Sequence, residues 1–387
     1  LGVGAVSLGI IEGVAEGVNS LLKVLSGRVS DRWSRRKPIV IAGYALSSAA
    51  RPFIGVTTSW FQVLAIRAID RTGKGIRGAP RDAMLATFAE VSNRGRVYGF
   101  HRAMDHAGAV CGPLVASAFL FFYPEEYRTL FALTIIPGII VIIVLLRVPS
   151  TGRATGSDGA RGSGLDARAN RSASIPETGR RAPSAEAPAL SRLPASFYRA
   201  MAVILLFSLG NASDAFLLLR FADVGIPAFW IPLLWSAIHI VKAISSLAGG
   251  QWSDTLGRRQ VIGLGWLVYA GVYAAFALTE SAVLLTAVFL IYGLYFGLTE
   301  GVEKAWVADL APPAAQGTAF GIYNALLGAG SLGASLLFGF IWTRVSPPAA
   351  FVTGAAFALA ATALLYLMFS TSAPDERGAD LHTDRAE

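Results

Sequence analysis

Long apolar stretches with no polar face recur along this chain. Residues 130–146, 261–278 and 350–368 contain no charged side chain. A helix on the surface of a soluble protein carries a polar face, whereas a helix that is apolar all round is buried or lies in lipid. About 20 apolar residues are needed to cross the hydrocarbon core of a bilayer. These stretches therefore predict membrane-spanning helices.

The same pattern, repeated along the chain, predicts about eleven spans. We expect them at residues 2–25, 39–57, 60–80, 95–122, 128–147, 198–219, 229–250, 260–278, 282–306, 316–341 and 349–370. Only 15% of the residues are charged, well below the ~25% that is usual in soluble proteins. The predicted fold class is therefore an all-α polytopic membrane protein.

Positive charge gathers in the segments between the spans. Arg28, Arg32, Arg35, Arg36 and Lys37 follow the first span, and Arg258 and Arg259 occupy a later loop. Residues 150–197 are rich in Gly, Ala, Ser, Pro and Arg, which predicts a disordered linker. Because Lys and Arg favour the cytoplasmic side of a membrane, we expect both loops, the linker and a disordered tail at 372–387 on that side of the cell membrane. This placement accounts for the net charge of +8, so we do not expect nucleic-acid binding.

The linker divides the chain into two related halves. Residues 1–149 hold five predicted spans and residues 198–371 hold six. The motif that runs from Gly27 through Asp31 to Arg35-Arg36 returns from Gly250 through Asp254 to Arg258-Arg259. Two pseudo-symmetric, parallel helical bundles are the expected product of such a repeat. Since the chain begins at Leu1 inside an apolar segment, we expect that one further N-terminal helix is missing from this sequence.

The repeated loop is what resembles the major facilitator superfamily of transporters. Residues 27–37 are similar to the family's signature loop between its second and third helices, with Ser34 in place of the usual second glycine. The resemblance covers the whole chain except the linker and the tail. It implies two bundles of six helices that give alternating access to a central site, and it makes the first span seen here the second helix of the family.

Two further motifs point to antiport. Residues 67–75 resemble the family's fourth-helix motif, in which a buried Arg is implicated in proton coupling. Gly108, Gly112 and Pro113 resemble the fifth-helix motif of antiporters, although Ala116-Ser117 replaces its trailing glycine pair. We expect these three residues to permit a bend and a close approach to a neighbouring helix.

The resemblance also implies a gate. Asp31 is expected to engage the positive N-terminal end of the helix that starts near Gln316-Gly317 when the cytoplasmic side is closed. Asp254 is expected to do the same near Arg94-Gly95. The residues that we assign to this gate are Gly27, Asp31, Arg32, Arg35, Arg36, Asp254, Arg258, Arg259, Glu300 and Glu303.

Ionisable residues inside the spans are the candidates for the transport site. A charge at membrane depth is costly, so such residues are expected to face the bundle interior or water. The candidates for proton coupling or for lining the cavity are Glu12, Glu16, Arg67, Asp70, Arg71, Lys74, Asp105, Asp214, His239, Lys242 and Asn324. Purely structural pairing between neighbouring helices is the alternative for each of them.

Helical spacing groups some of these candidates on single faces. Glu12 and Glu16 are one turn apart, and Arg67, Asp70 and Lys74 are spaced so that they share a face. We favour a cavity role for Arg67 and Asp70. Arg77 and Arg81, which are closer to the cytoplasmic end, are expected to reach the lipid headgroups.

Several function classes receive no support from the sequence. A nucleotide-binding GxxxxGK[ST] loop is absent, as are metal-binding HExxH motifs, so we predict neither an enzyme nor a cofactor. The leading hypothesis is a monomeric secondary transporter that exports a small molecule by proton-coupled antiport. The alternatives are an importer or symporter of an organic anion, transport of a metal ion or siderophore, and a receptor or scaffold that transports nothing.

Overall fold

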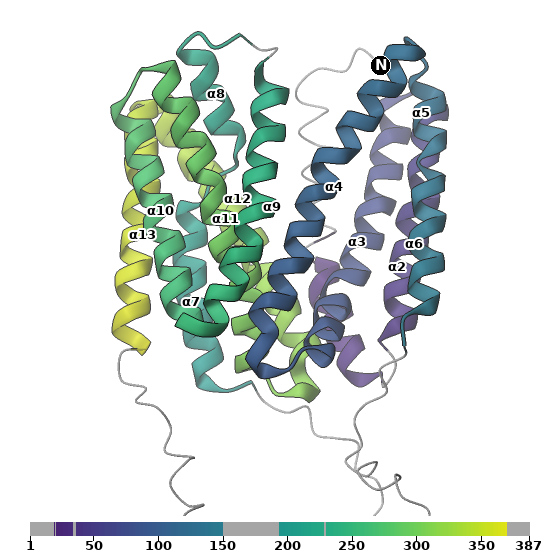
Figure 1. The fold of residues 1–387 in the computed structure, drawn as a ribbon, viewed down its shortest axis with the longest axis horizontal. Helices are drawn as coiled ribbons and strands as arrows, with labels where there is room; N and C mark the ends of the chain where they lie inside the picture. Colours follow the sequence, from purple (N-terminus) through teal and green to yellow (C-terminus); the bar gives the residue numbers. More distant parts are fainter. Residues whose placement is uncertain (1–18, 20, 34–35, 150–192, 228–229, 370–387) are drawn as a thin grey trace, which may run out of the picture.

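The computed structural model describes residues 19, 21–33, 36–149, 193–227 and 230–369, and every regular element among them is helical (Figure 1). Residues 21–32 form the first described helix. It is followed by α2 (Lys37–Ala50) with its 3-10 extension η1 (Arg51–Val56), α3 (Trp60–Phe88), η2 (Val91–Asn93), α4 (Arg94–Phe122), α5 (Tyr127–Leu133) and α6 (Ile135–Arg147). The second half comprises α7 (Ala195–Gly210), α8 (Ala215–Asp223), α9 (Ile231–Leu256), α10 (Arg258–Leu278), α11 (Ala282–Leu310), η4 (Pro313–Ala315), α12 (Gln316–Arg344) and α13 (Pro347–Phe369).

The described helices have the surface of a membrane protein. Nine of them, in some cases with a short neighbouring helix, are long and apolar enough to cross a bilayer. On α6, the side chains of Ile139, Ile140 and Val144 are each about half exposed. Such a belt of aliphatic side chains faces outward only where lipid replaces water as the solvent. The prediction of an all-α, multi-pass membrane protein is confirmed.

The helices form two groups that stand side by side (Figure 1). Helices α2 to α6 lie in one group and α7 to α13 in the other. Arg147 at the end of α6, Ala195 at the start of α7 and Phe369 at the end of α13 all lie at the same end of the molecule, which we call the linker end. Its counterpart is called the far end.

The second group has a dense aromatic core. Phe207 stacks on Trp266 with 4.8 Å between the ring centroids, and Tyr269 stacks on Tyr273 at 4.1 Å. All four side chains are buried. Aromatic pairs of this kind contribute ~0.5–1.5 kcal/mol beyond their area burial, so this packing stabilises the second bundle.

Helix boundaries differ from the expected spans at several places. The span expected at 60–80 continues through Pro80 to Phe88, although proline lacks a backbone N–H, and α9 runs six residues further than expected, to Leu256. The predicted linker extended to residue 197, but α7 already begins at Ala195; residues 150–192 and 370–387 lie outside the described residues.

The span expected at 198–219 is interrupted at residues 211–214, between α7 and α8. Side chains satisfy the polar groups at the break. The Asn211 amide donates to the hydroxyl of Tyr295 at 3.0 Å, and the Ser335 hydroxyl accepts from the Ser213 backbone N–H at 3.1 Å. A broken helix is tolerated at membrane depth when neighbouring helices supply such partners. The hydrophobicity pattern alone carries no sign of these long-range contacts.

Small residues bring the two groups together along α4 and α9. The two helices run antiparallel, with Gly95 against Gly250 and Gly99 against Ser246. Gly301 of α11 joins them, because a Cβ on it would lie only 3.0 Å from the Gly99 nitrogen. Glycines at these positions let the helix backbones touch. We call this contact the α4–α9 seam.

The expected close approach at Gly108 and Gly112 is not made. A Cβ at either position would meet no described atom within 4 Å, and α4 continues as a helix through Pro113. The reason is that α4 approaches α9 at the linker end and separates from it toward the far end (Figure 1). Close packing therefore falls on Gly95 and Gly99, about 2.5 to 5 turns earlier on the same helix.

This geometry predicts opposite outcomes for two glycines of α4. Gly99→Val places a side chain against the Ser246 carbonyl and within about 3.0 Å of the Gly250 Cα, so overpacking should destabilise the protein by ~1–3 kcal/mol. Gly108→Val carries the same change in helix propensity but meets open space. The melting midpoint of each variant in detergent tests this. Equal midpoints would show that the seam does not need glycine.

Candidate functional site

A carboxylate of the first half caps a helix of the second half. Asp31 accepts hydrogen bonds from the backbone N–H groups of Gly317 at 2.7 Å and Thr318 at 2.6 Å. The first N–H groups of a helix have no partner within it and carry partial positive charge, so an anion is favoured there. Arg36 lies 3.3 Å from the same carboxylate and also donates to the Pro313 carbonyl at 3.3 Å. The contact expected for Asp31 is present in the structure.

The repeat-related carboxylate makes the same contact in the opposite direction. Asp254 of α9 accepts from the backbone N–H groups of Gly95 and Arg96, both at 2.8 Å, at the start of α4. Arg258 lies 2.5 Å from Asp254 and 2.9 Å from Asp309. Each half therefore caps one helix of the other half, and both caps lie at the linker end.

The other glycine and arginine positions of the repeated motif have separate surroundings. A Cβ on Gly27 would overlap the Gly317 carbonyl, so this glycine permits contact between the halves. Arg259 donates to the Phe369 carbonyl within its own half, and Arg32 is exposed. Arg35 lies outside the described residues.

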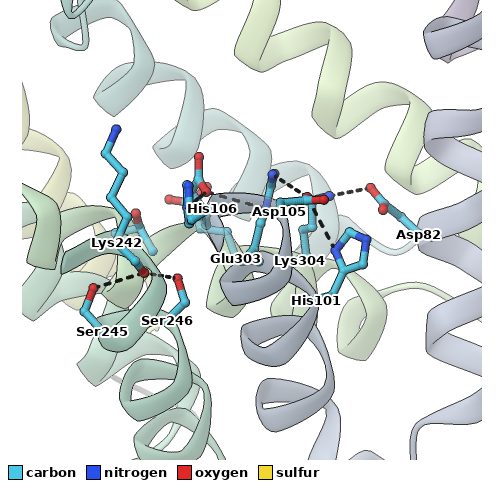
Figure 2. A network of polar contacts seen from close by, with 12 residues as sticks. Asp82, His101, Asp105, His106, Lys242, Ser245, Ser246, Glu303 and Lys304 are labelled. Carbon is cyan, nitrogen blue, oxygen red and sulfur yellow. Dashed lines mark hydrogen bonds and ion pairs between the residues drawn. The ribbon is translucent and has the colours of Figure 1, made fainter. Parts of the chain in front are cut away.

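A buried ion pair joins the halves further inside. The Lys304 ammonium of α11 lies 2.6 Å from the Asp82 carboxylate of α3, and each side chain is only 2% exposed (Figure 2). Arg81 lies 3.3 Å from the same carboxylate, and the Tyr98 hydroxyl donates to the Asp82 carbonyl at 2.6 Å. Loss of either partner would leave the other charge buried without compensation, which is strongly unfavourable. This pair is therefore a main electrostatic contact between the two half-bundles.

Sequence reasoning missed Asp82 because the expected span ended at residue 80. It also placed Arg81, together with Arg77, at the lipid headgroups, which is wrong. Arg81 pairs with Asp82, and Arg77 lies 4.0 Å above the Tyr44 ring and donates to the Ser47 hydroxyl at 3.0 Å. The available signal was the cluster of charged residues Arg77, Arg81 and Asp82, which indicates that α3 continues beyond residue 80.

A second polar contact lies next to this pair (Figure 2). It is further along α4 from the linker end than Gly95 and Gly99. His106 Nε2 of α4 lies 3.2 Å from the Glu300 carboxylate of α11, and His106 Nδ1 lies 3.3 Å from His239 Nδ1 of α9. Arg102 is 3.5 Å from Glu300 and 3.4 Å from Asp105. The structure thus brings the predicted residues Glu300, Asp105 and His239 into one network.

Glu303 was expected to form part of the gate between the halves, but its described contact is internal to the second half. It accepts from the Tyr323 hydroxyl of α12 at 2.9 Å and is buried. Lys304, the next residue on the helix, is the one that reaches the other half. A shift of one residue turns a helical side chain by about 100°, which is why sequence position alone did not separate the two.

An ion pair within the second half lies beside aromatic rings. Lys242 of α9 is 3.5 Å from the Asp214 carboxylate, which accepts from the Tyr292 hydroxyl at 2.8 Å. The Lys242 ammonium lies 3.4 Å from the centre of the Phe296 ring and 5.6 Å from that of Trp235. Aromatic faces stabilise a cation that has left water. The break before α8 is what positions Asp214 for this contact.

Asp70 has its described partners within its own half. The Asp70 carboxylate lies 2.9 Å from Arg51 and 3.3 Å from Lys74, and both partners belong to the first half. We favoured a cavity role for Asp70, but the structure turns it toward η1. Arg67 and Arg71 lie on the same helix.

The Asn324 amide donates to the Phe320 carbonyl one turn earlier on its own helix, at 2.7 Å. It was expected to contribute an uncharged contact to the cavity. Glu12 and Glu16 lie outside the described residues.

The described residues place a hollow of apolar side chains away from these clusters. Within the described segments, no group of three or more His, Cys, Asp or Glu side chains is placed to hold a metal ion. An apolar hollow of about 500 Å³ lies between α2, η1 and α3, where Phe53, Ile66 and Ile69 line it. No charged residue lines it. The candidate site is therefore the polar region between the half-bundles.

Comparison with known families decides the identity. The model of the Major Facilitator Superfamily matches residues 1–302 and again 222–385. The chain belongs to the major facilitator superfamily. Members of this superfamily are transporters, so the chain is a membrane transporter and not an enzyme.

Individual superfamily members show the same relationship at different distances. An uncharacterized superfamily transporter of Methanocaldococcus jannaschii is 29% identical over 376 residues, which cover 94% of this chain and 86% of that protein. The multidrug resistance protein MdtH of Edwardsiella ictaluri is 29% identical over 127 residues, 33% of this chain and 31% of that protein. The solved structure of the proton:xylose symporter XylE has a TM-score of 0.68 at 16% identity and covers 94% of this chain and 86% of that one, which shows the shared fold alone.

The buried pair makes a prediction about stability. Lys304→Met leaves Asp82 buried with Arg81 as its described basic neighbour, so we expect a loss near the lower end of the ~3–5 kcal/mol that a broken buried pair costs. The double variant Asp82→Leu/Lys304→Met removes both charges and should recover most of that loss. Unfolding in mixed micelles measures the three free energies. A loss below ~1 kcal/mol in the single variant would contradict a strong buried pair.

Proposed function

We propose that this superfamily member exports a small molecule in exchange for protons, as a monomer, with its linker end in the cytoplasm. The observation that carries the proposal is the set of ionised and titratable groups that join the halves at this end. Asp82 with Lys304 is a buried contact between helices of different halves, and the buried His106 meets the partly exposed Glu300 across the same interface. Such contacts must break and re-form when a transporter alternates its access, and protonation changes their strength.

The orientation rests on charge. Arg28, Arg32 and Arg96 lie at the linker end, and the linker itself carries many arginines. Positively charged loops favour the cytoplasmic side. In the conformation described, the halves touch at this end through the two caps and the glycines of the seam, so the state is one with the cytoplasmic side closed.

Export is supported by the partial relationship to a multidrug resistance protein and by the antiporter-like motif around Pro113. The aromatic rings beside Lys242 and Asp214 supply a surface that suits amphipathic organic molecules. Lys242 also supports the second candidate, a symporter of organic anions, because its ammonium can pair with a substrate carboxylate.

The direction of coupling separates the two candidates. Purified protein in liposomes should take up ethidium when the lumen is acidic and the membrane potential is clamped, because an antiporter exchanges outgoing protons for incoming dye. Rhodamine 6G and the anion fluorescein extend the panel, and protein-free liposomes are the control. Uptake of any of these dyes only when the outside is acidic would establish symport and contradict the proposal. No proton-dependent flux of any of them would contradict it as well.

The two caps make a second prediction. Asp31→Asn and Asp254→Asn each remove the charge at a helix start, which is worth about 0.3–2 kcal/mol. Each variant should therefore raise the ratio of linker-open to linker-closed molecules by roughly 2- to 30-fold. Spin labels on Ser92→Cys and Thr255→Cys, in a Cys111→Ser background, report the distance across the linker end. Glu125→Gln, an exposed acid between α4 and α5, is the control, and a shift as large in this control would rule out a specific effect of the caps.

A further inference from the structure

Two histidines, one from each half, contact each other where α4 and α9 meet, and both can bind protons. His106 of the first half and His239 of the second half face each other through their Nδ1 atoms at 3.3 Å, and their ring centroids are 5.4 Å apart. His106 is buried and His239 is half-buried. A contact between two titratable rings across the moving interface has a strength that depends on how many protons the pair holds.

The surrounding charges fix the hydrogen positions of the pair. The Glu300 carboxylate, held by Arg102 at 3.5 Å, can only accept, so His106 Nε2 must carry a proton and donate to it at 3.2 Å. In neutral His106, Nδ1 is then an acceptor. His239 Nδ1 must therefore donate, which leaves His239 Nε2 with a free lone pair. The result is a directed chain of hydrogen bonds from His239 through His106 to Glu300.

This chain has a limited capacity for protons. A first added proton can go to His239 Nε2, and the Nδ1 donor bond to His106 stays intact. A second added proton must go to His106 Nδ1, where it would point at the N–H of His239. Two donors that face each other cannot form a hydrogen bond, and two imidazolium rings at this distance repel. The closed contact therefore holds one added proton, whereas separated rings hold two.

We propose that His106 and His239 together form the binding site of the coupled proton, and that full protonation of the pair releases the α4–α9 seam at the linker end. The inference rests on the proposed function and names the groups that perform the coupling. His239 is half-buried, so it can take up a proton while the seam is closed. After the seam opens, the bound protons leave on the linker side. Protons then move inward, which is the direction that can drive the proposed export.

Other titratable and charged groups lie on the elements that pack around the pair. They are His101, Arg102 and Asp105 on α4, Lys242 on α9, Asp214 before α8, Glu300, Glu303 and Lys304 on α11, and Arg81 and Asp82 on α3. Lys242 and Arg102 bring positive charge close to the rings, which opposes a second proton in the closed state. Glu300 favours the first one. Both influences increase the difference in binding free energy between the first and the second added proton in the closed state.

The sign of the pH dependence follows from this count. The linker-open state binds one more proton than the linker-closed state, so acidification favours the open state. With one proton of difference, the ratio of open to closed molecules rises by up to ~10-fold for each unit of falling pH across the titration range of the pair.

Spin-label distances across the linker end test the site without a substrate. Protein in nanodiscs, labelled at Ser92→Cys and Thr255→Cys in the Cys111→Ser background, is measured from pH 8 to pH 5. His239→Asn keeps a polar group near the Nδ1 position, and His106→Gln keeps one that can reach Glu300, but neither titrates in this range. With all histidines present, acid should produce a population at longer distance. Both variants should keep the closed distance throughout.

His101→Asn is the matched control, because His101 lies on the same helix and contacts Asp105 at 3.9 Å. It should open with acid as the parent protein does. Acid opening that persists in His239→Asn and His106→Gln, or that is absent from the parent protein, would overturn the inference.

Dye transport by the same proteins distinguishes this failure from failure of the proposed function. If the parent protein drives ethidium uptake with an acidic lumen but its label distances ignore the histidines, the histidine site is wrong and antiport stands. If the distances follow the histidines but no proton-dependent flux of any dye occurs, the proposed function is wrong, and only the histidine-controlled opening of the seam stands.

Discussion

An ionised side chain removed from water needs a partner, and this requirement organises the region between the two half-bundles. Asp82 has Lys304, Glu300 has Arg102 and His106, and Asp31 and Asp254 have helix N-termini of the opposite half. In a medium of low dielectric constant each partner is worth more than it would be in water. Because most of these partners come from the other half, the same requirement that folds each bundle also joins the two. Separation of the halves then needs either water or a change in protonation.

The glycine contacts and the charge contacts have different roles in holding the two halves together. Gly95, Gly99 and Gly250 bring the helix backbones into contact, which fixes where the halves meet and excludes water there. The charged groups are placed by that contact and determine how strongly the closed state is favoured. Since none of these groups is covalently linked, the closed state can be stable and still reversible, as a transporter requires.

Much of the fold was predictable from the sequence because lipid imposes a simple rule on helix length and composition. The spans that became α4, α10, α12 and α13 were placed within a few residues, and the repeat around Asp31 and Asp254 predicted both helix caps. Partners that depend on helix rotation were not predictable. Glu303 and Lys304 are neighbours in sequence, yet only Lys304 reaches Asp82. The break at 211–214 depends on Tyr295 and Ser335, which lie more than 80 residues away and leave no local pattern.

The order of side-chain sizes along the α4–α9 seam has a mechanical consequence. At the linker end the backbones of α4 and α9 touch through glycines, and further along the two helices meet through the imidazole rings of His106 and His239. Because small residues separate α4 and α9 at the linker end and larger side chains separate them further along, the two helices are inclined to each other. Their relative movement is then a tilt about a shallow pivot and not a slide along their length. Side-chain volume along the seam thus sets the angle between α4 and α9. A substitution that changes this volume can change the angle without altering the charged groups.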